Sequence, residues 1–166
     1  MLLARLATPT LLAHYAEVME EMRRREVIRS SNNPAADYAE HLCVQALSLA
    51  LARKSVKGYD ATDAAGKRYQ IKGRRLTRQN PSRRQLGALR ELDEKPFDYM
   101  AAVLFNEDLT VRKACLLPRN QVQQHSAYVK RTNSYRFLLA DSVWELHGVV
   151  DITKKVKAAQ AKGARS

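Results

Sequence analysis

The chain has 166 residues, of which 45% are hydrophobic, and this composition suits one globular domain with a buried core. Its apolar runs, such as Met100 to Phe105, are too short to span a membrane, and Met1 to Ala7 lacks the ordered charged and hydrophobic regions of a signal peptide. We therefore expect a cytoplasmic protein with no membrane partner, in which Cys43 and Cys115 remain buried thiols.

The formal net charge of +12 comes from two segments of the chain. Nine basic residues and no acidic ones lie between Lys67 and Arg90, and five more basic residues without an acid lie between Ile152 and Ser166. Removing these fourteen from the 29 Lys and Arg leaves fifteen basic residues against 17 acidic ones. Such concentrated charge indicates a polyanionic partner. A solubilising surface with a disordered tail is the alternative.

The first predicted element is an amphipathic helix that starts at Thr8 and Pro9, since proline suits the first helical position. A second helix is predicted from Pro34 to about Arg53, after the polar loop Ser30 to Asn33. Glu40 falls on its apolar face, where a carboxylate is unfavourable unless something pairs with it. A salt bridge at the edge of the core is the alternative explanation for this glutamate.

Two short strands follow, from Gly58 to Asp63 and from Lys67 to Arg74, and together they predict a β-hairpin. Side chains alternate across a strand. The hairpin can therefore present Asp60, Gln70 and Lys72 together on one face.

The second half of the chain is predicted to form central strands and short helices. Phe97 to Phe105 and Leu109 to Leu117 are typical of central strands, whereas Gln85 to Leu92 fits either a helix or a strand. The remaining predictions are a basic loop at Arg75 to Arg84, a helix from Arg119 to about Tyr128, a strand at Tyr135 to Leu139, a helical turn from Asp141, and a last helix after Asp151. We expect a single domain over residues 1–151 and a basic C-terminal helix or tail over residues 152–166.

The segment Gly58-Tyr59-Asp60, followed by a turn and Gln70-Ile71-Lys72, resembles the active-site hairpin of the PD-(D/E)XK nuclease superfamily, which includes restriction endonucleases and DNA-repair nucleases. In that family an acid on one strand is followed by acid-x-Lys on the next, and a preceding helix often supplies a glutamate. Here Asp60 takes the first acidic position, Lys72 takes the lysine position, and Glu40 lies in the preceding helix.

The resemblance covers roughly Asn33 to Ala127 and includes the order of helix, hairpin, apolar strand pair and helix. It implies an α/β (α+β) fold with a restriction-endonuclease-like core, in which helices flank a central mixed β-sheet, and an extra N-terminal helix precedes this core. It also implies a Mg²⁺-dependent DNA endonuclease of restriction or defence type, with Mn²⁺ as a substitute for Mg²⁺. A homodimer would cut both DNA strands.

The resemblance also assigns roles to five residues. Asp60 would be the principal metal ligand, the backbone carbonyl of Ile71 another, and Glu40 a direct or water-mediated one. Lys72 would orient or activate the attacking water and offset developing charge. Gln70 stands where the family usually has an acid, so it could bind the metal through its amide oxygen but brings no charge. A catalytically impaired nuclease fold that serves as a DNA-binding or regulatory protein is therefore the second hypothesis.

Basic residues around the hairpin are predicted to contact phosphates of double-stranded DNA. They are Arg68, Arg74, Arg75, Arg78, Arg83 and Arg84, with Lys130 and Arg131 in a second contact loop. A small RNA-associated structural protein, which would depend on the basic tail, is the third hypothesis.

Overall fold

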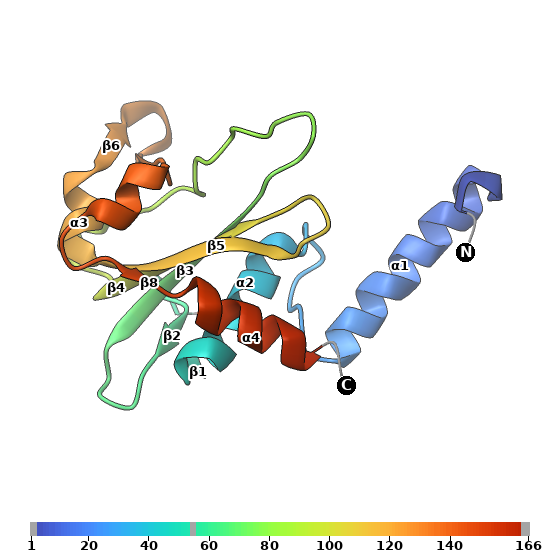
Figure 1. Cartoon of the computed structure of the whole chain (residues 1–166), viewed down its shortest axis with the longest axis horizontal. Helices are drawn as coiled ribbons and strands as arrows, with labels where there is room; N and C mark the ends of the chain where they lie inside the picture. The colour runs from blue at the N-terminus through green and yellow to red at the C-terminus, as the bar shows by residue number, and fades with distance from the viewer. Residues whose placement is uncertain (1–2, 54–55, 164–166) are drawn as a thin grey trace.

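A mixed six-stranded sheet organises the part of the chain that the structure, a computed structural model, describes: residues 3–53 and 56–163 (Figure 1). The strand order is β1-β2-β3-β4-β5-β8. These strands are β1 (Ala50–Leu51), β2 (Ala61–Thr62), β3 (Arg68–Arg75), β4 (Tyr99–Phe105), β5 (Val111–Pro118) and β8 (Val150–Asp151). β3 and β4 run parallel, and the other neighbouring pairs run antiparallel. Helices flank the sheet, so the predicted α+β class with a central mixed sheet is confirmed.

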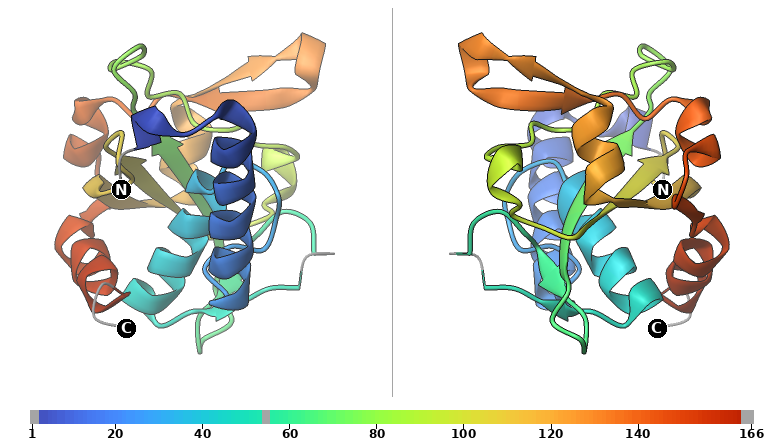
Figure 2. Two further views of the ribbon diagram at one scale, coloured as in Figure 1. Left: turned by 90° about the vertical axis from the view of Figure 1, so that its right-hand side faces the viewer. Right: turned by 90° about the vertical axis from the view of Figure 1, so that its left-hand side faces the viewer.

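The helices lie on both sides of this sheet (Figures 1 and 2). They are α1 (Thr8–Arg24), α2 (Ala35–Leu47), α3 (Arg119–Gln124) and α4 (Thr153–Gly163), with short 3₁₀ helices at Leu3–Arg5, Leu92–Glu94, Lys130–Thr132 and Asp141–Glu145. The buried strand β4 separates two apolar clusters because its alternate side chains face opposite sides. Val103 and Phe105 pack with α2 and α4, whereas Met100 and Leu104 pack with the cluster that includes Val122 of α3.

The C-terminal basic segment contributes to the core. Ile152, Val156 and Ala159 are buried in the cluster shared with α2, while the lysines of α4 remain exposed. Residues 164–166 of the predicted tail lie outside the described residues. Cys43 and Cys115 are free and buried, as predicted.

Two predicted helices end earlier in the structure than the sequence pattern suggested. α2 stops at Leu47 because Ser48 takes a left-handed backbone conformation with φ of 54°, and Ala50 then joins the sheet in β1. α3 stops at Gln124, because Ser126–Val129 pairs with Ser134–Phe137 in a separate two-stranded sheet, β6 and β7. Partners that are distant in the sequence therefore override the local preference for helix.

The segment that fitted either a helix or a strand is extended. Gln85 pairs with Leu138, and Leu89 pairs with Tyr135, through isolated bridges, before the 3₁₀ turn Leu92–Glu94. The connection between β3 and β4 therefore crosses the sheet face without an α-helix.

Helix α1 stands away from the sheet (Figure 1). The predicted helix is confirmed, but much of its apolar stripe is not buried: Leu12 is 64% exposed, Tyr15 57% and Val18 56%, whereas Met19 is buried. None of the helices within the described ranges is long and apolar enough to cross a membrane.

Candidate functional site

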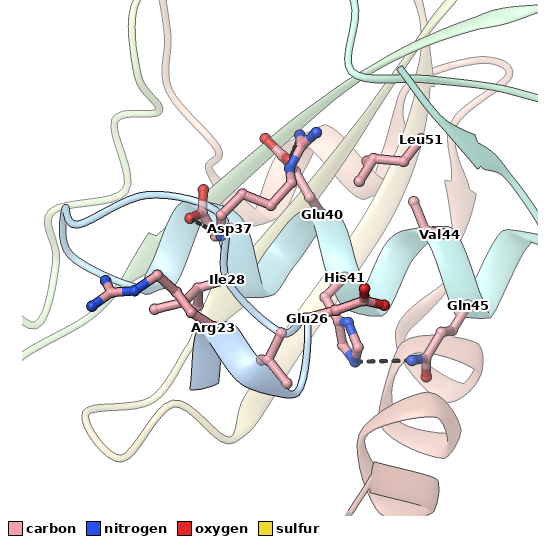
Figure 3. Close-up of a pocket in the computed structure, with 11 residues that line it drawn as sticks. Arg23, Glu26, Ile28, Asp37, Glu40, His41, Val44, Gln45 and Leu51 are labelled. Carbon is pink, nitrogen blue, oxygen red and sulfur yellow. Dashed lines mark hydrogen bonds and ion pairs between the residues drawn. The ribbon is translucent and has the colours of Figure 1, made fainter. Parts of the chain in front are cut away.

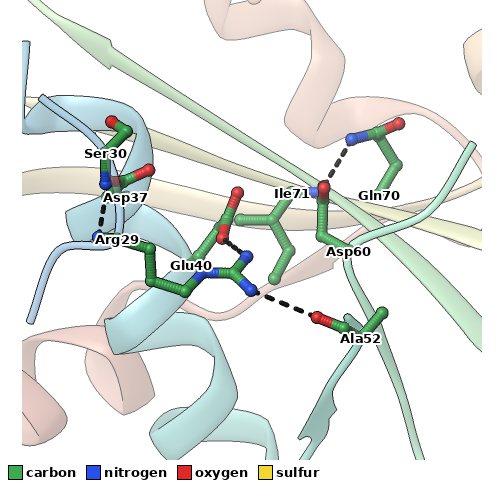
Figure 4. A network of polar contacts seen from close by, with 8 residues as sticks. All are labelled: Arg29, Ser30, Asp37, Glu40, Ala52, Asp60, Gln70 and Ile71. Atoms are coloured by element: carbon green, nitrogen blue, oxygen red, sulfur yellow. Dashed lines mark hydrogen bonds and ion pairs between the residues drawn. The ribbon is translucent and has the colours of Figure 1, made fainter. Parts of the chain in front are cut away.

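The hairpin of β2 and β3 brings Asp60 and Gln70 together, as the strand alternation predicted. The Asp60 N–H donates to the Tyr69 carbonyl with 2.8 Å between nitrogen and oxygen, so Asp60 sits where β2 begins. The Asp60 carboxylate then turns back toward β3 (Figure 4). Its Oδ2 accepts a 2.6 Å hydrogen bond from the Ile71 backbone N–H and a second bond from Nε2 of Gln70.

The direction of the Ile71 carbonyl, the predicted backbone ligand, follows from this contact. The N–H and C=O groups of one residue in a strand leave toward the same neighbouring strand. Because the Ile71 N–H faces Asp60, the Ile71 carbonyl is directed to the same edge of β3. β2 pairs with β3 only through Ala61–Thr62, so among the described residues no strand covers this edge of β3 at Ile71.

Glu40 approaches the same edge from α2. Its side chain is 16% exposed, and its Oε2 lies 2.5 Å from Nη2 of Arg29. Nη1 of the same arginine donates to the Ala52 carbonyl at 3.1 Å (Figure 4). Burial and the nearby Asp60 raise the pKa of Glu40, while Arg29 opposes this rise. The salt bridge that was the alternative explanation for Glu40 is therefore present. Glu40 also lies close enough to Asp60 for the two charges to interact.

Arg29 is the residue at this site that sequence reasoning missed. It lies in the loop before α2, and Asp37, in the first turn of α2, fixes that loop by accepting from the backbone N–H groups of Arg29 and Ser30 at 2.8 and 2.7 Å. The available signal was Glu40 itself on the apolar face of α2, since a buried carboxylate requires a cationic partner.

The pKa values of Glu40, Asp60 and Lys72 are shifted in the direction that favours the neutral form of each group. Burial raises the pKa of Asp60, and the Ile71 N–H, Lys72 and Gln70 oppose the rise. Burial lowers the pKa of Lys72, which Asp60 and Glu40 partly restore. The ammonium of Lys72 donates to the Ala88 carbonyl at 3.3 Å. Clusters of this kind are typical of functional sites.

Two hollows flank the Asp60 and Gln70 pair. One, of about 320 Å³, is lined by Asp60, Glu40, Arg29 and Arg53 among others. The other, of about 470 Å³, is lined by Lys57, Gly58, Gln70, Ala88, Arg90 and Glu91. Each hollow therefore combines one of the hairpin residues with at least one cationic side chain, as a phosphate-binding surface requires.

A further hollow of about 600 Å³ lies between the end of α1 and α2 (Figure 3). Its walls include Glu40, His41, Val44 and Leu51, and His41 Nε2 is 2.8 Å from Nε2 of Gln45. Among its described lining residues, Glu40 is the one that belongs to the predicted site. We place the site at Asp60, because the shifted carboxylates and lysine meet there.

The predicted DNA-contacting arginines divide into two groups. Arg68 pairs with Asp98 at 3.7 Å, Arg74 donates to the Gln85 carbonyl at 2.6 Å, and Arg84 pairs with Asp141 at 2.8 Å, so these side chains are engaged in the fold. Arg75 is partly buried, and its Nε has no hydrogen-bond partner among the described residues.

The second group faces solvent. Arg78, 93% exposed, pairs with Glu107 at 3.1 Å, and Arg83, Lys130 and Arg131 are exposed as well. These four side chains are therefore available to contact phosphates.

The chemistry of the oxygen donors near Asp60 can be compared with what a divalent cation requires. Within the described residues, no group of three or more His, Cys, Asp or Glu side chains is arranged to hold a metal. The carboxylates of Asp60 and Glu40 and the carbonyl of Ile71 are hard oxygen donors. Burial raises the pKa of both acids, so a cation would have to compete with protons for these carboxylates. Gln70 presents its amide nitrogen to Asp60, so its amide must turn over to offer oxygen. Carboxylate, carbonyl and amide oxygens are of the kind that Mg²⁺ or Mn²⁺ prefers as ligands.

No protein-family model matches this chain, and no similar sequence is found among the curated proteins. A functional assignment therefore depends on the residues of the site and on their geometry.

Proposed function

We propose that this protein is a Mg²⁺-dependent DNA endonuclease of the PD-(D/E)XK type, with Asp60, Glu40, Gln70 and Lys72 at its active site. The observation that carries this proposal is the carboxylate of Asp60 at the edge of β3, close to Glu40 and Lys72. The pKa values of all three groups are shifted in the direction that favours the neutral form. The order of α2, the β2–β3 hairpin, β4, β5 and α3 supports a restriction-endonuclease-like core.

The roles follow from the positions of the side chains. Asp60 and Glu40 would hold the cation with the Ile71 carbonyl, and a bound Mg²⁺ supplies positive charge at the phosphate and makes a nearby water a better nucleophile. The Lys72 ammonium donates to the Ala88 carbonyl and lies within reach of the charge on Asp60, so it can offset charge that develops on the phosphate. Lys57 and Arg90 line the hollow beside Gln70, where the flanking phosphates would lie.

A DNA-binding protein that has lost cleavage is the second candidate, because two features of the site favour it. Arg29 already supplies a positive charge beside Glu40. It also opposes the rise that burial causes in the pKa of Asp60. Gln70 supplies an amide in place of a third carboxylate. In this alternative, the site would bind phosphate through its cations without a metal.

A plasmid-cleavage assay distinguishes the two candidates. The wild-type protein should nick or cut supercoiled DNA with Mg²⁺ or Mn²⁺ and lose this activity in EDTA. Asp60→Asn and Lys72→Met should each reduce the rate at least ~100-fold. Lys154→Met, which changes an exposed lysine of α4, is the matched control and should keep the wild-type rate.

Two other outcomes are informative. DNA that binds but stays intact with either metal would favour the second candidate. Undiminished cleavage by both active-site variants would show that the site is elsewhere. A homodimer would place two such clusters on one duplex, one for each strand.

A further inference from the structure

A two-stranded hairpin, called here the ribbon, stands out from the body of the molecule (Figure 2). It runs from Ser126 to Phe137, forms a sheet of its own, and consists of β6, the 3₁₀ turn Lys130–Thr132, and β7. Asn133 closes the turn in a left-handed conformation with φ of 43°. The side chains near the tip are mostly exposed, so the ribbon can present both its strands to a partner.

The ribbon carries positive charge without acidic residues. Residues 109–140 contain no Asp or Glu, and the ribbon itself holds the exposed Lys130, Arg131 and Arg136. Tyr128, 54% exposed, donates from its hydroxyl to Oδ1 of Asn133 at 3.0 Å and packs against the Tyr135 ring at 5.2 Å between centroids. The ribbon is therefore stiffened near a basic tip, which suits a polyanion.

The base of the ribbon is joined to the extended segment that follows the basic loop. The N–H of Leu89 donates to the Tyr135 carbonyl at 3.0 Å, and the N–H of Tyr135 donates back to the Leu89 carbonyl at 2.7 Å. Closer to the body, the Leu86 N–H donates to the carbonyl of the fully buried Phe137 at 3.0 Å. This segment acts as a partial third strand beside the ribbon.

The same segment reaches the candidate active site. Ala88, the residue before Leu89, accepts the hydrogen bond from the ammonium of Lys72, and Ala88 and Arg90 line the hollow that Gln70 also lines. A displacement of the ribbon would therefore move Leu89, then the adjacent Ala88 carbonyl, and through it Lys72.

We propose that the ribbon enters the major groove of double-stranded DNA, and that its seating there sets the position of the Ala88 carbonyl and so of Lys72. This inference rests on the proposed function, whose active site it completes. The major groove of B-form DNA, about 12 Å wide, admits a two-stranded β-ribbon. Double-stranded RNA has a deep, narrow major groove that would exclude it.

Binding without metal tests the groove assignment separately from cleavage. We would measure fluorescence anisotropy in EDTA with a 30-base-pair DNA duplex, an RNA duplex of the same sequence, and single-stranded DNA. Lys130→Ala with Arg131→Ala should weaken duplex DNA binding at least ~10-fold and reduce the slope of log affinity against log salt by about 2. Lys154→Ala with Lys155→Ala, an equal change of charge on α4, should change the affinity less than ~2-fold.

The competing substrates decide the kind of groove. RNA duplex and single-stranded DNA should each bind at least ~10-fold more weakly than duplex DNA to the wild-type protein. Equal binding of either competitor would overturn the groove assignment. Equal losses in the ribbon variant and the α4 variant would overturn it as well.

Hydrogen exchange tests the connection between the ribbon and the segment that carries the Ala88 carbonyl, without relying on activity. Adding duplex DNA in EDTA should slow exchange of the Leu89 and Tyr135 amides in the wild-type protein, and this protection should disappear in the ribbon double variant. Unchanged exchange of both amides in DNA-bound wild-type protein would overturn the connection.

The nuclease proposal and the ribbon inference can fail independently. If the wild-type protein cuts no DNA but the ribbon variant loses duplex binding, the nuclease proposal fails and the ribbon inference stands. If the wild-type protein cuts DNA and the ribbon variant cuts it with the same KM and salt dependence, the ribbon inference fails and the nuclease proposal stands.

Discussion

Arg29 and Glu40 form an ion pair, with 2.5 Å between Nη2 and Oε2, at the wall of the hollow that Asp60 also lines. The guanidinium neutralises part of the charge that a metal would otherwise neutralise, because it favours the ionised forms of both Glu40 and Asp60. A divalent cation at Asp60 and Glu40 would therefore compete with Arg29 for the same carboxylates.

This competition predicts the behaviour of Arg29→Met. Removing the guanidinium leaves Glu40 buried without its partner, so the free energy of unfolding in EDTA should fall by about 2 kcal/mol. Mn²⁺ should restore stability and raise the Tm of Arg29→Met more than that of the wild-type protein. Thermal unfolding with and without Mn²⁺ measures both effects.

Arg23→Met is the matched control, because Arg23 forms an ion pair with Glu20 on the exposed part of α1. Its Tm should stay near the wild-type value and respond to Mn²⁺ as the wild-type protein does. A Tm of Arg29→Met that responds to Mn²⁺ no more than this control would contradict competition between Arg29 and the metal.

The raised pKa of Asp60 predicts how stability depends on pH. Its pKa in the folded protein lies above the ordinary value of 3.8 because burial favours the protonated form. At a pH between 3.8 and this raised pKa, the folded protein therefore binds more protons than the unfolded chain. The stabilising contribution of this group is present below that window and is lost as the pH rises through it. The free energy of unfolding of wild-type protein, relative to Asp60→Asn, should therefore decrease as the pH rises from about 4.

Urea denaturation between pH 3 and 7 measures this difference, and Asp141→Asn provides a control of opposite sign. Arg84 lowers the pKa of the exposed Asp141, so the contribution of that carboxylate is lost as the pH falls. Parallel curves for wild-type protein and Asp60→Asn would show that Asp60 titrates alike in the folded and unfolded states.

Local patterns in the sequence predicted the central part of the site. Alternation along two short strands placed Asp60 beside Gln70, and the continuous apolar run before Phe105 predicted the buried strand β4. Helical spacing predicted Glu40 on an apolar face of α2, and its side chain is 16% exposed in the structure. These features depend on neighbours within one element or one hairpin, which the local sequence specifies.

Long-range contacts were not predictable in the same way. Arg29 reaches Glu40 from a loop that carries no motif, and Lys72 finds the Ala88 carbonyl in a segment whose pattern fits a helix or a strand equally. The predicted helix after Arg119 continues too far because Tyr128 pairs with Tyr135 across a turn. Each of these contacts is decided by tertiary packing, which outweighs intrinsic propensity.

Restoring an acid at position 70 tests whether the missing charge limits metal binding. Gln70→Glu adds a third carboxylate to the donor set, so Mn²⁺ should bind roughly 10-fold more tightly in a calorimetric titration. In EDTA the same variant should unfold at a lower temperature, because Gln70 no longer donates to Asp60 and two like charges face each other.

Gln79→Glu makes the same chemical change in the exposed loop after β3 and should leave Mn²⁺ affinity unchanged. If Gln70→Glu binds Mn²⁺ no more tightly than Gln79→Glu does, the residue at position 70 does not contact the metal.

Close packing between α2 and β3 predicts the effect of a single methyl group at Gly73. A Cβ at Gly73 would lie 2.6 Å from the Ala35 carbonyl oxygen and 2.8 Å from the Ala39 Cβ, both in α2. Gly73→Ala should therefore push α2 away from the sheet, with a loss of roughly 1–3 kcal/mol in the free energy of unfolding. Because α2 carries Glu40, Mn²⁺ binding should weaken as well. Gly163→Ala, where an added Cβ meets nothing within 4 Å, should change neither property. Unfolding and Mn²⁺ titrations of the two variants measure both effects, and a Gly73→Ala protein of wild-type stability and Mn²⁺ affinity would show that Glu40 does not need this close approach.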